Sequence, residues 1–359
     1  MDIRRMMKTV LIAVACIAAA FAVIVLSGTP IRFSMDGAEK STEAADGEKI
    51  PIRVLILPKF EIGEMTGDAP GEAQYLYEDM FMDSDEYVIP GLGNGSVMYV
   101  KDGRAMCLAG VGKVDSALRT SAILSDERFD FSDAYIISLG CGGSARGYSV
   151  MGDTVIITGI ADFDIGHHAD PRELKDPDGP TWFHDDTLDD SASLVSDREL
   201  TDRVYELTKD IKLESTDATR QAMKDTFGDE KWADREPKVL KGTDVSSDDF
   251  WKGEYSHRDA EYIAEYYGCP DPFAVTDMEE IAVGQVIERL GMMDRYIGVR
   301  VSVNMDIFLK GESPESLWDT GTAIISNDSA ETLDIFPVAM KNNYKVVRTI
   351  IKAIDNGDL

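Results

Sequence analysis

The feature that most constrains the fold is an apolar run that ends in a cluster of glycines, from Ala134 to Ser144. Such a run, bounded by glycine, is typical of a buried strand in a parallel sheet. Gly140, Gly142 and Gly143 remove side chains where the strand is expected to end, so backbone N–H groups there can approach an anion or a sugar closely. A tight turn without a ligand fits the same glycines.

Other short apolar runs alternate along the chain with segments of helical periodicity. Strands are predicted over 52–58, 104–110, 153–160, 238–242, 273–276 and 296–303, and helices after residue 112 and over 200–209, 279–290 and 342–356. Strands separated by helices predict an α/β domain with a largely parallel sheet, whose ligands bind beyond the carboxyl ends of the strands. The polar stretches 171–196 and 225–237 are expected to be insertions or lids over that face.

Charge and composition exclude several partners. The chain has 36 Lys and Arg residues against 66 Asp and Glu residues, a formal net charge of −30. Such a surface repels the phosphates of nucleic acids, and it favours a neutral small molecule over a nucleotide as ligand. The four cysteines and four histidines have no spacing typical of a zinc site. We therefore predict no metal, no cofactor and no nucleic acid.

The N-terminus carries a predicted export signal. Arg4, Arg5 and Lys8 precede an apolar run of 17 residues from Val10 to Leu26, and this pattern is typical of a signal peptide or of an uncleaved signal anchor. We expect a leader over residues 1–28, a flexible spacer over 29–48 and one folded domain over 49–359. The domain is then expected on the outer face of the cytoplasmic membrane, in the periplasm or outside the cell, and an uncleaved leader would attach it to the membrane.

Residues 60–72 resemble the signature of the purine nucleoside permease family. The agreement continues in chain order through roughly residues 50 to 310, at the Gly110 to Gly112 turn, the glycines of 140–143, the aromatic segment 248–253, residues 277–279 and residues 300–304. The family is similar in fold to the nucleoside phosphorylases and nucleosidases. The resemblance therefore implies a three-layer α/β/α sandwich around a mixed sheet, and a purine nucleoside (adenosine, inosine or guanosine) as ligand.

The resemblance also implies roles for individual residues. Met278 and Glu279 correspond to a pair that holds the ribose, and a carboxylate suits this task because it accepts from two adjacent hydroxyls. Asn304 corresponds to the position that contacts the purine near N7. Its amide can donate a hydrogen bond to the departing base, but it cannot act as a general acid. Gly110, Gly112, Gly140 and Gly142 belong to the glycine turns of the expected site.

Three further features bear on the chemistry. Phe60 and Trp251 are candidates for stacking on the purine, and Glu61 or Glu64 in the first loop could act as the base that activates a water molecule. In the hexameric phosphorylases an arginine that grips phosphate stands where this chain has Ser138. Arg146 and Lys113 are near in sequence and could substitute. The loss of that arginine favours hydrolysis over phosphorolysis.

Three classes of function remain open from the sequence. The first is an exported nucleoside-binding protein in nucleoside uptake, which needs a separate membrane transporter because one apolar segment cannot enclose a polar path. The second is an extracytoplasmic nucleosidase or phosphorylase that cleaves the N-glycosidic bond. The third is a structural or interaction domain on the same fold. The sequence also leaves open whether the protein forms a homo-oligomer.

Overall fold

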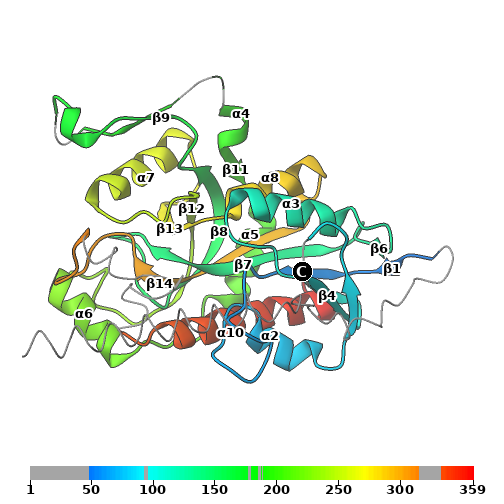
Figure 1. Ribbon diagram of the computed structural model, residues 1–359. Coiled ribbons are helices and arrows are strands. Elements are labelled where there is room, and N and C mark those ends of the chain that lie inside the picture. The colour runs from blue at the N-terminus through cyan, green and yellow to red at the C-terminus, as the bar shows by residue number, and fades with distance from the viewer. Residues whose placement is uncertain (1–47, 93–95, 177–178, 185–186, 188, 315–332) are drawn as a thin grey trace, which may run out of the picture. The chain divides into compact units, whose positions relative to one another are not determined.

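The structure is a computed structural model that describes residues 48–359, except 93–95, 177–178, 185–186, 188 and 315–332 (Figure 1). The predicted leader and all of the predicted spacer but residue 48 lie outside the described residues. No helix in the described part of the chain is long and apolar enough to cross a bilayer.

A sheet of ten strands organises this part of the chain, with the order β11-β8-β12-β13-β7-β2-β5-β4-β3 and with β14 paired to both β7 and β8. The strands are β2 (Val54–Leu57), β3 (Asp85–Val88), β4 (Val97–Lys101), β5 (Arg104–Met106), β7 (Tyr135–Ser144), β8 (Thr154–Asp162), β11 (Ser193–Val195), β12 (Val239–Ser246), β13 (Phe273–Asp277) and β14 (Tyr296–Met305). Two small pairs lie apart from it, β1 (Ile50–Pro51) with β6 (Phe129–Asp130) and β9 (His167–His168) with β10 (Trp182–Phe183).

The sheet is mixed, as expected, but it is not largely parallel. Five of its pairings are parallel, namely β12 with β13 and β8, β7 with β14 and β2, and β2 with β5. Five are antiparallel, namely β8 with β11 and β14, β13 with β7, and β4 with β3 and β5. Strands β3 and β4, which continue the sheet antiparallel beyond β5, and the short edge strand β11 have no strong signal in the sequence.

Part of the sheet closes on itself. The path β7-β14-β8-β12-β13 returns to β7, so these strands form a small barrel. Register shifts in β12 at Gly242/Thr243 and in β14 at Ser302/Asn304 accompany the closure, and bulges of this kind bend a strand. An open three-layer sandwich therefore does not describe this part of the fold.

Helices cover both faces of β2 and β7. Helices α3 (Lys113–Leu124) and α8 (Glu280–Arg289) contact each other on one side, and α10 (Phe336–Asn356) and α2 (Gln74–Leu76) lie on the other (Figure 1). Leu55 and Leu57 join the apolar cluster on the α3 and α8 side, whereas Val54 and Ile56 join the cluster on the α10 side. Burial on both faces explains the unbroken apolar run over 52–58.

The remaining elements are shorter or peripheral. They are α4 (Asp189–Ala192), α5 (Arg198–Thr208), α6 (Asp217–Phe227), α7 (Glu254–Tyr266), the π-helical turn η1 (Tyr77–Phe81) and the 3-10 turns η2 (Pro171–Glu173) and η3 (Met293–Arg295). The predicted strands, and the predicted helices that correspond to α3, α5, α8 and α10, are present with ends shifted by a few residues.

The glycines of 140–143 are not the turn that the sequence suggests, because β7 continues through them to Ser144. A Cβ at Gly140 would collide with the guanidinium of Arg300, and a Cβ at Gly142 would lie 2.5 Å from the carbonyl oxygen of Thr276. These glycines therefore let a buried arginine and strand β13 lie against β7.

Candidate functional site

A cavity of about 110 Å³ lies where β2, β7, β13 and β14 end. It thus combines segments that are far apart in the sequence at the position predicted for a ligand in an α/β fold. Among the predicted site residues, those that line it are Phe60, Gly142, Trp251, Met278, Glu279 and Asn304. Lining residues outside that prediction include Lys59, Glu72, Cys141, Phe250, Asp277, Asp306 and Phe336.

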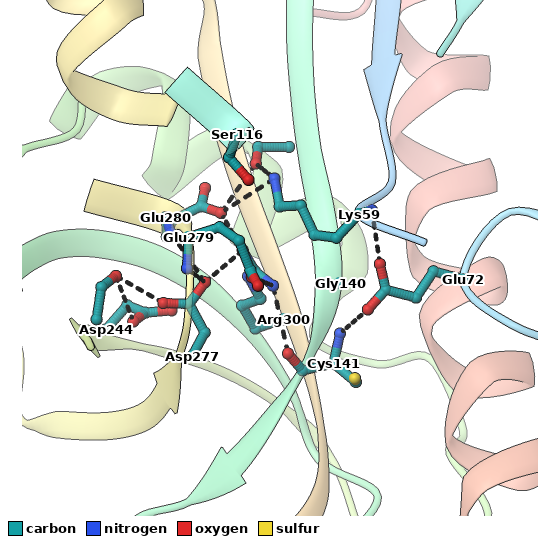
Figure 2. Close-up of polar contacts among 12 residues, drawn as sticks. Lys59, Glu72, Ser116, Gly140, Cys141, Asp244, Asp277, Glu279, Glu280 and Arg300 are labelled. Carbon is teal, nitrogen blue, oxygen red and sulfur yellow. Dashed lines mark hydrogen bonds and ion pairs between the residues drawn. The ribbon is translucent and has the colours of Figure 1, made fainter. Parts of the chain in front are cut away.

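Arg300 on β14 is the centre of a buried ion-pair cluster beside the cavity (Figure 2). Its guanidinium is fully buried and forms ion pairs with Asp277, with Glu279 at 3.3 Å and with Glu280 at 2.6 Å. It also donates to the carbonyl oxygen of Cys141 at 3.3 Å. We call these residues together with Lys59 the Arg300 cluster. The positive charge of one buried guanidinium allows several carboxylates to be buried close together.

Glu280 faces away from the cavity, toward the interior. Its carboxylate accepts from the hydroxyl of Ser138 at 2.8 Å and from the hydroxyl of Tyr296, and it lies 3.7 Å from the Lys59 ammonium. Burial acts to raise its pKa, but the charges of Arg300 and Lys59 outweigh burial and bring the pKa of Glu280 to about 2. Glu280 is therefore a permanently charged partner of the two buried cations.

Glu279 lines the cavity on the other side of the same guanidinium. The N–H of Gly112 donates to its Oε1 at 3.2 Å, and Arg300 donates to its Oε2 at 3.3 Å. Burial and the charge of Asp277 raise the pKa of Glu279 to about 8, although Arg300 and Lys59 oppose the shift. This carboxyl group therefore titrates near neutral pH and can accept hydrogen bonds from a diol once it is ionised.

Asp277 and Asp244 complete the acidic surroundings of Arg300 (Figure 2). Asp277 accepts from the N–H of Glu280 at 2.9 Å and from the hydroxyl of Ser246 at 2.6 Å, which fixes the start of α8. Burial, and then the charge of Asp277, raise the pKa of Asp244 well above its ordinary value. Its surroundings therefore disfavour the ionised form of Asp244.

Glu72 is a second buried carboxylate in the cavity wall. It accepts from the backbone N–H of Lys59 and from that of Cys141, both at 2.7 Å (Figure 2). Burial raises its pKa against the opposing effects of Arg300 and the two N–H groups. Glu72 is the last residue of the segment that resembles the family signature, and it comes just before the buried Ala73 at the start of α2. This position next to a buried residue is the signal in the sequence that could have identified Glu72 as buried.

Glu61, the predicted base, is not among the residues that line the cavity. Its carboxylate accepts from the backbone N–H groups of Ile62, Gly71, Ala73 and Gln74, at 2.9 Å for Ile62 and Ala73 and at 2.7 Å for Gln74. Burial raises its pKa, whereas these N–H groups lower it. The side chain thus fastens both ends of the loop that precedes α2.

The predicted glycine turn at Gly110 and Gly112 lies behind the cavity wall. Both residues have positive φ, +87° and +82°, and a Cβ at Gly110 would collide with the carboxylate of Asp115. Val111 between them lines the cavity, and the N–H of Gly112 holds Glu279. The turn therefore positions the acid rather than forming the surface that a ligand would touch.

Aromatic side chains form the apolar part of the wall. Trp251 stacks on Phe163 with ring centroids 5.1 Å apart, and Phe60 stacks on Phe336 at 6.4 Å. Phe250, 53% exposed, lines the cavity where solvent reaches it. A flat ring bound here would meet aromatic surface.

Asn304 and Asp306 come from the end of β14. A Cβ at Gly143 would lie 3.3 Å from Oδ1 of Asn304, so the glycine leaves room for this amide. The carboxylate of Asp306 accepts from the N–H of Arg146 at 3.1 Å and lies 2.6 Å from Nδ1 of His257. Sequence reasoning did not select Asp306 or His257, because nothing in the sequence links α7 to the end of β14.

Cations that could grip a phosphate are paired elsewhere. Lys113 forms ion pairs with Asp162 at 2.8 Å and Asp164 at 2.7 Å, and Arg146 pairs with Glu254 at 2.6 Å. Ser138 accepts from the Lys59 ammonium at 2.6 Å. Among the described residues that line the cavity, Lys59 is the one cation. No group of three His, Cys, Asp or Glu residues in the described ranges is arranged to hold a metal ion.

Comparisons with known proteins agree with this geometry at the level of family and fold. The model of the purine nucleoside permease (NUP) family matches residues 51–357. A search of curated protein sequences finds no match.

Solved structures with a similar fold include 5′-methylthioadenosine/S-adenosylhomocysteine nucleosidases. The S. pneumoniae enzyme, solved with the transition-state inhibitor MT-ImmA, has 15% identity and a TM-score of 0.51, over 84% of this chain and 100% of that one. The Helicobacter pylori enzyme, solved with butyl-thio-DADMe-Immucillin-A, has 13% identity and a TM-score of 0.52, over 85% and 99%. A futalosine hydrolase mutant of H. pylori has 14% identity and a TM-score of 0.52, over 84% and 99%. These likenesses establish a mixed α/β fold of the nucleosidase kind.

Proposed function

The chain belongs to the purine nucleoside permease family, and from this premise we propose that it binds a purine nucleoside and hydrolyses its N-glycosidic bond. The observation that carries the proposal is that two buried carboxylates of raised pKa, Glu72 and Glu279, line one cavity together with Asn304. Hydrolysis of a nucleoside needs a sugar holder, a base for water and a hydrogen-bond donor to the departing purine.

Glu279 is the proposed ribose holder. It comes from the N-terminus of α8, and its two oxygens are already oriented by Gly112 and Arg300. An ionised carboxylate keeps lone pairs for the 2′ and 3′ hydroxyls, and charge-assisted hydrogen bonds of this kind are strong. Met278 beside it would contact the sugar.

Glu72 replaces Glu61 as the proposed base. A general base works best when its pKa lies near the working pH, and burial moves the pKa of Glu72 in that direction. In the proposed reaction, water attacks C1′ and gives its proton to Glu72 while the C1′–N9 bond breaks. Asn304 donates to N7 as negative charge develops on the purine, and Phe60 and Trp251 contact its ring.

Water is favoured over phosphate as the nucleophile. The cavity wall carries the acidic side chains of Glu72, Asp249, Asp277, Glu279 and Asp306, and its cation Lys59 is engaged by Ser138. A phosphate dianion would meet repulsion there without the arginine that usually binds it.

The family description favours a second candidate, a nucleoside-binding role in uptake. This role would need a separate membrane transporter, and it fits the predicted export signal in residues 1–28. The same cavity and the same Glu279 would then bind nucleoside without turnover.

The test uses purified protein with inosine, adenosine or guanosine, with and without phosphate, and measures free base and ribose by chromatography. Hydrolysis predicts base and ribose in equal amounts, independent of phosphate. Release that requires phosphate would replace the proposal with a phosphorylase. Calorimetric binding without release would favour the uptake role, and no binding would favour a structural or interaction domain.

A further inference from the structure

We propose that Asp306, His257 and Glu261 form a proton relay that runs from solvent to the cavity and protonates the departing purine. The inference deepens the proposed hydrolysis and rests on it. Asn304 can only donate a hydrogen bond, so without another donor the purine would leave as an anion, and general acid catalysis is what overcomes this barrier.

Asp306 is the end of the relay that touches substrate. It lines the cavity two residues after Asn304, and its backbone is fixed on both sides. Its N–H donates to the carbonyl oxygen of Ser144 at 3.0 Å, and its carbonyl oxygen accepts from the N–H of Gly253 at 2.8 Å. Its carboxylate is held by the backbone N–H of Arg146 and by His257, and it lines the same cavity as the amide expected at N7.

His257 is the middle of the relay. It lies in the first turn of α7, buried, with Nδ1 2.6 Å from Oδ2 of Asp306. Its other ring nitrogen, Nε2, lies 3.4 Å from Oε1 of Glu261, one helical turn further along α7. The side chain of Glu261 is 56% exposed. Each step from cavity to solvent thus spans a contact between two titratable groups.

The charges around His257 favour its protonated form. Asp306 faces it from the end of β14 and Glu261 from its own helix, whereas Arg146, which follows β7, lies near Glu261 and pairs with Glu254. Burial acts to lower the pKa of His257, but the two carboxylates raise it to about 9. At neutral pH the histidine therefore carries the proton that the reaction needs.

With this relay, every proton that is gained or lost in the reaction is accounted for. As the C1′–N9 bond breaks, its electron pair stays on the purine. His257 gives its Nδ1 proton to the ionised Asp306, which passes a proton to a purine ring nitrogen other than N7, because N7 accepts from Asn304. Asp306 is ionised again at the end of the step, and the neutral His257 regains a proton from solvent through Glu261. Water forms the bond to C1′ and loses its proton to Glu72, which returns it to solvent. The net change is addition of water across the glycosidic bond.

The test compares inosine with p-nitrophenyl β-D-ribofuranoside, whose nitrophenolate leaves without protonation. For Asp306→Asn and His257→Gln we expect kcat on inosine to fall about 100- to 1,000-fold. We expect kcat on the nitrophenyl riboside to fall less than about 5-fold, because a leaving group that needs no proton gains little from a general acid. Equal losses on the two substrates would assign the pair a structural role and overturn the relay.

Glu261→Gln gives a second readout at a half-exposed position, where folding is not at risk. Removing its charge lowers the pKa of His257, so the alkaline limb of kcat for inosine should move from near pH 9 to lower pH. An unmoved limb would overturn the relay. Failure of the wild-type protein to cleave either substrate would overturn the hydrolase itself, whereas wild-type turnover with equal losses in the variants overturns the relay alone.

Discussion

The two sides of Arg300 present a contrast between neighbouring residues. Glu279 and Glu280 share one guanidinium, yet the pKa of Glu279 is raised to about 8 and that of Glu280 is lowered to about 2. The difference arises because Glu280 also contacts Ser138 and Tyr296 and lies near Lys59, whereas Glu279 faces the cavity and the charge of Asp277. The interior side therefore supplies stability, and the cavity side supplies a group that can change its charge.

The largest expected effect is on the interior side. Glu280→Gln leaves Arg300 and Lys59 without their buried partner and should lower the free energy of unfolding by about 3–5 kcal/mol. Glu288→Gln, at an exposed position of the same helix α8, is the matched control and should change it by less than about 0.5 kcal/mol. Denaturant unfolding followed by circular dichroism measures both. Equal stability of the two variants would mean that the interior ion pairs are dispensable.

A similar contrast holds between Glu61, at the start of the loop that precedes α2, and Glu72, at its end: Glu61 has a structural role and Glu72 a proposed catalytic one. Glu72→Gln should lower kcat about 100- to 10,000-fold, because it removes the proposed base. It should also cost about 1–3 kcal/mol of unfolding free energy, because an amide NH2 would face one of the two backbone N–H groups that Glu72 holds. Glu61→Gln should cost a similar free energy, because its carboxylate satisfies four backbone N–H groups, but it should have little effect on kcat. The exposed Glu64→Gln is the control for both. A well-folded Glu61→Gln variant without turnover, beside an active Glu72→Gln variant, would reverse the two assignments.

On the cavity side, Glu279→Gln should weaken ribonucleoside binding about 10- to 100-fold, since a neutral amide accepts more weakly than a carboxylate. The loss should be smaller for 2′-deoxyinosine, which already lacks one of the two hydroxyls. Isothermal titration calorimetry of both ligands with both proteins gives the coupling between acid and hydroxyl. Equal losses for inosine and 2′-deoxyinosine would remove the ribose assignment.

The sequence predicts the features of the fold and the site that depend on neighbouring residues, and it misses those that depend on residues far apart in the chain. The apolar run 52–58 predicts β2 because burial on both faces leaves a continuous pattern. Closure of the barrel leaves no such pattern, because it depends on β14 pairing with two strands at once. The link between His257 and Asp306 spans 49 positions and has no periodic signal. Glu61 and Glu72 look alike in sequence, and only the loop's path decides which one faces the cavity.

The most direct measure of the contrast is the sign of the pH dependence of stability. The folded-state pKa of Glu279 is raised to about 8 from its ordinary value of 4.5, so the folded protein holds a proton that the unfolded chain releases. Its contribution to stability is therefore lost as pH rises from 4.5 through 8. Glu280, lowered to about 2, contributes stability that is present above 4.5 and lost as pH falls toward 2.

The unfolding free energy of wild type minus that of Glu279→Gln should accordingly fall between pH 5 and pH 8, whereas the same difference for Glu280→Gln should fall between pH 4 and pH 2. Urea unfolding at a series of pH values measures both differences with one protocol. Parallel slopes would mean that the two carboxyl groups titrate as one unit around Arg300 and that the cavity side holds no separate proton. Opposite slopes would identify Glu279 as the member of the pair that titrates separately, so that binding of a ribose can favour its ionised form.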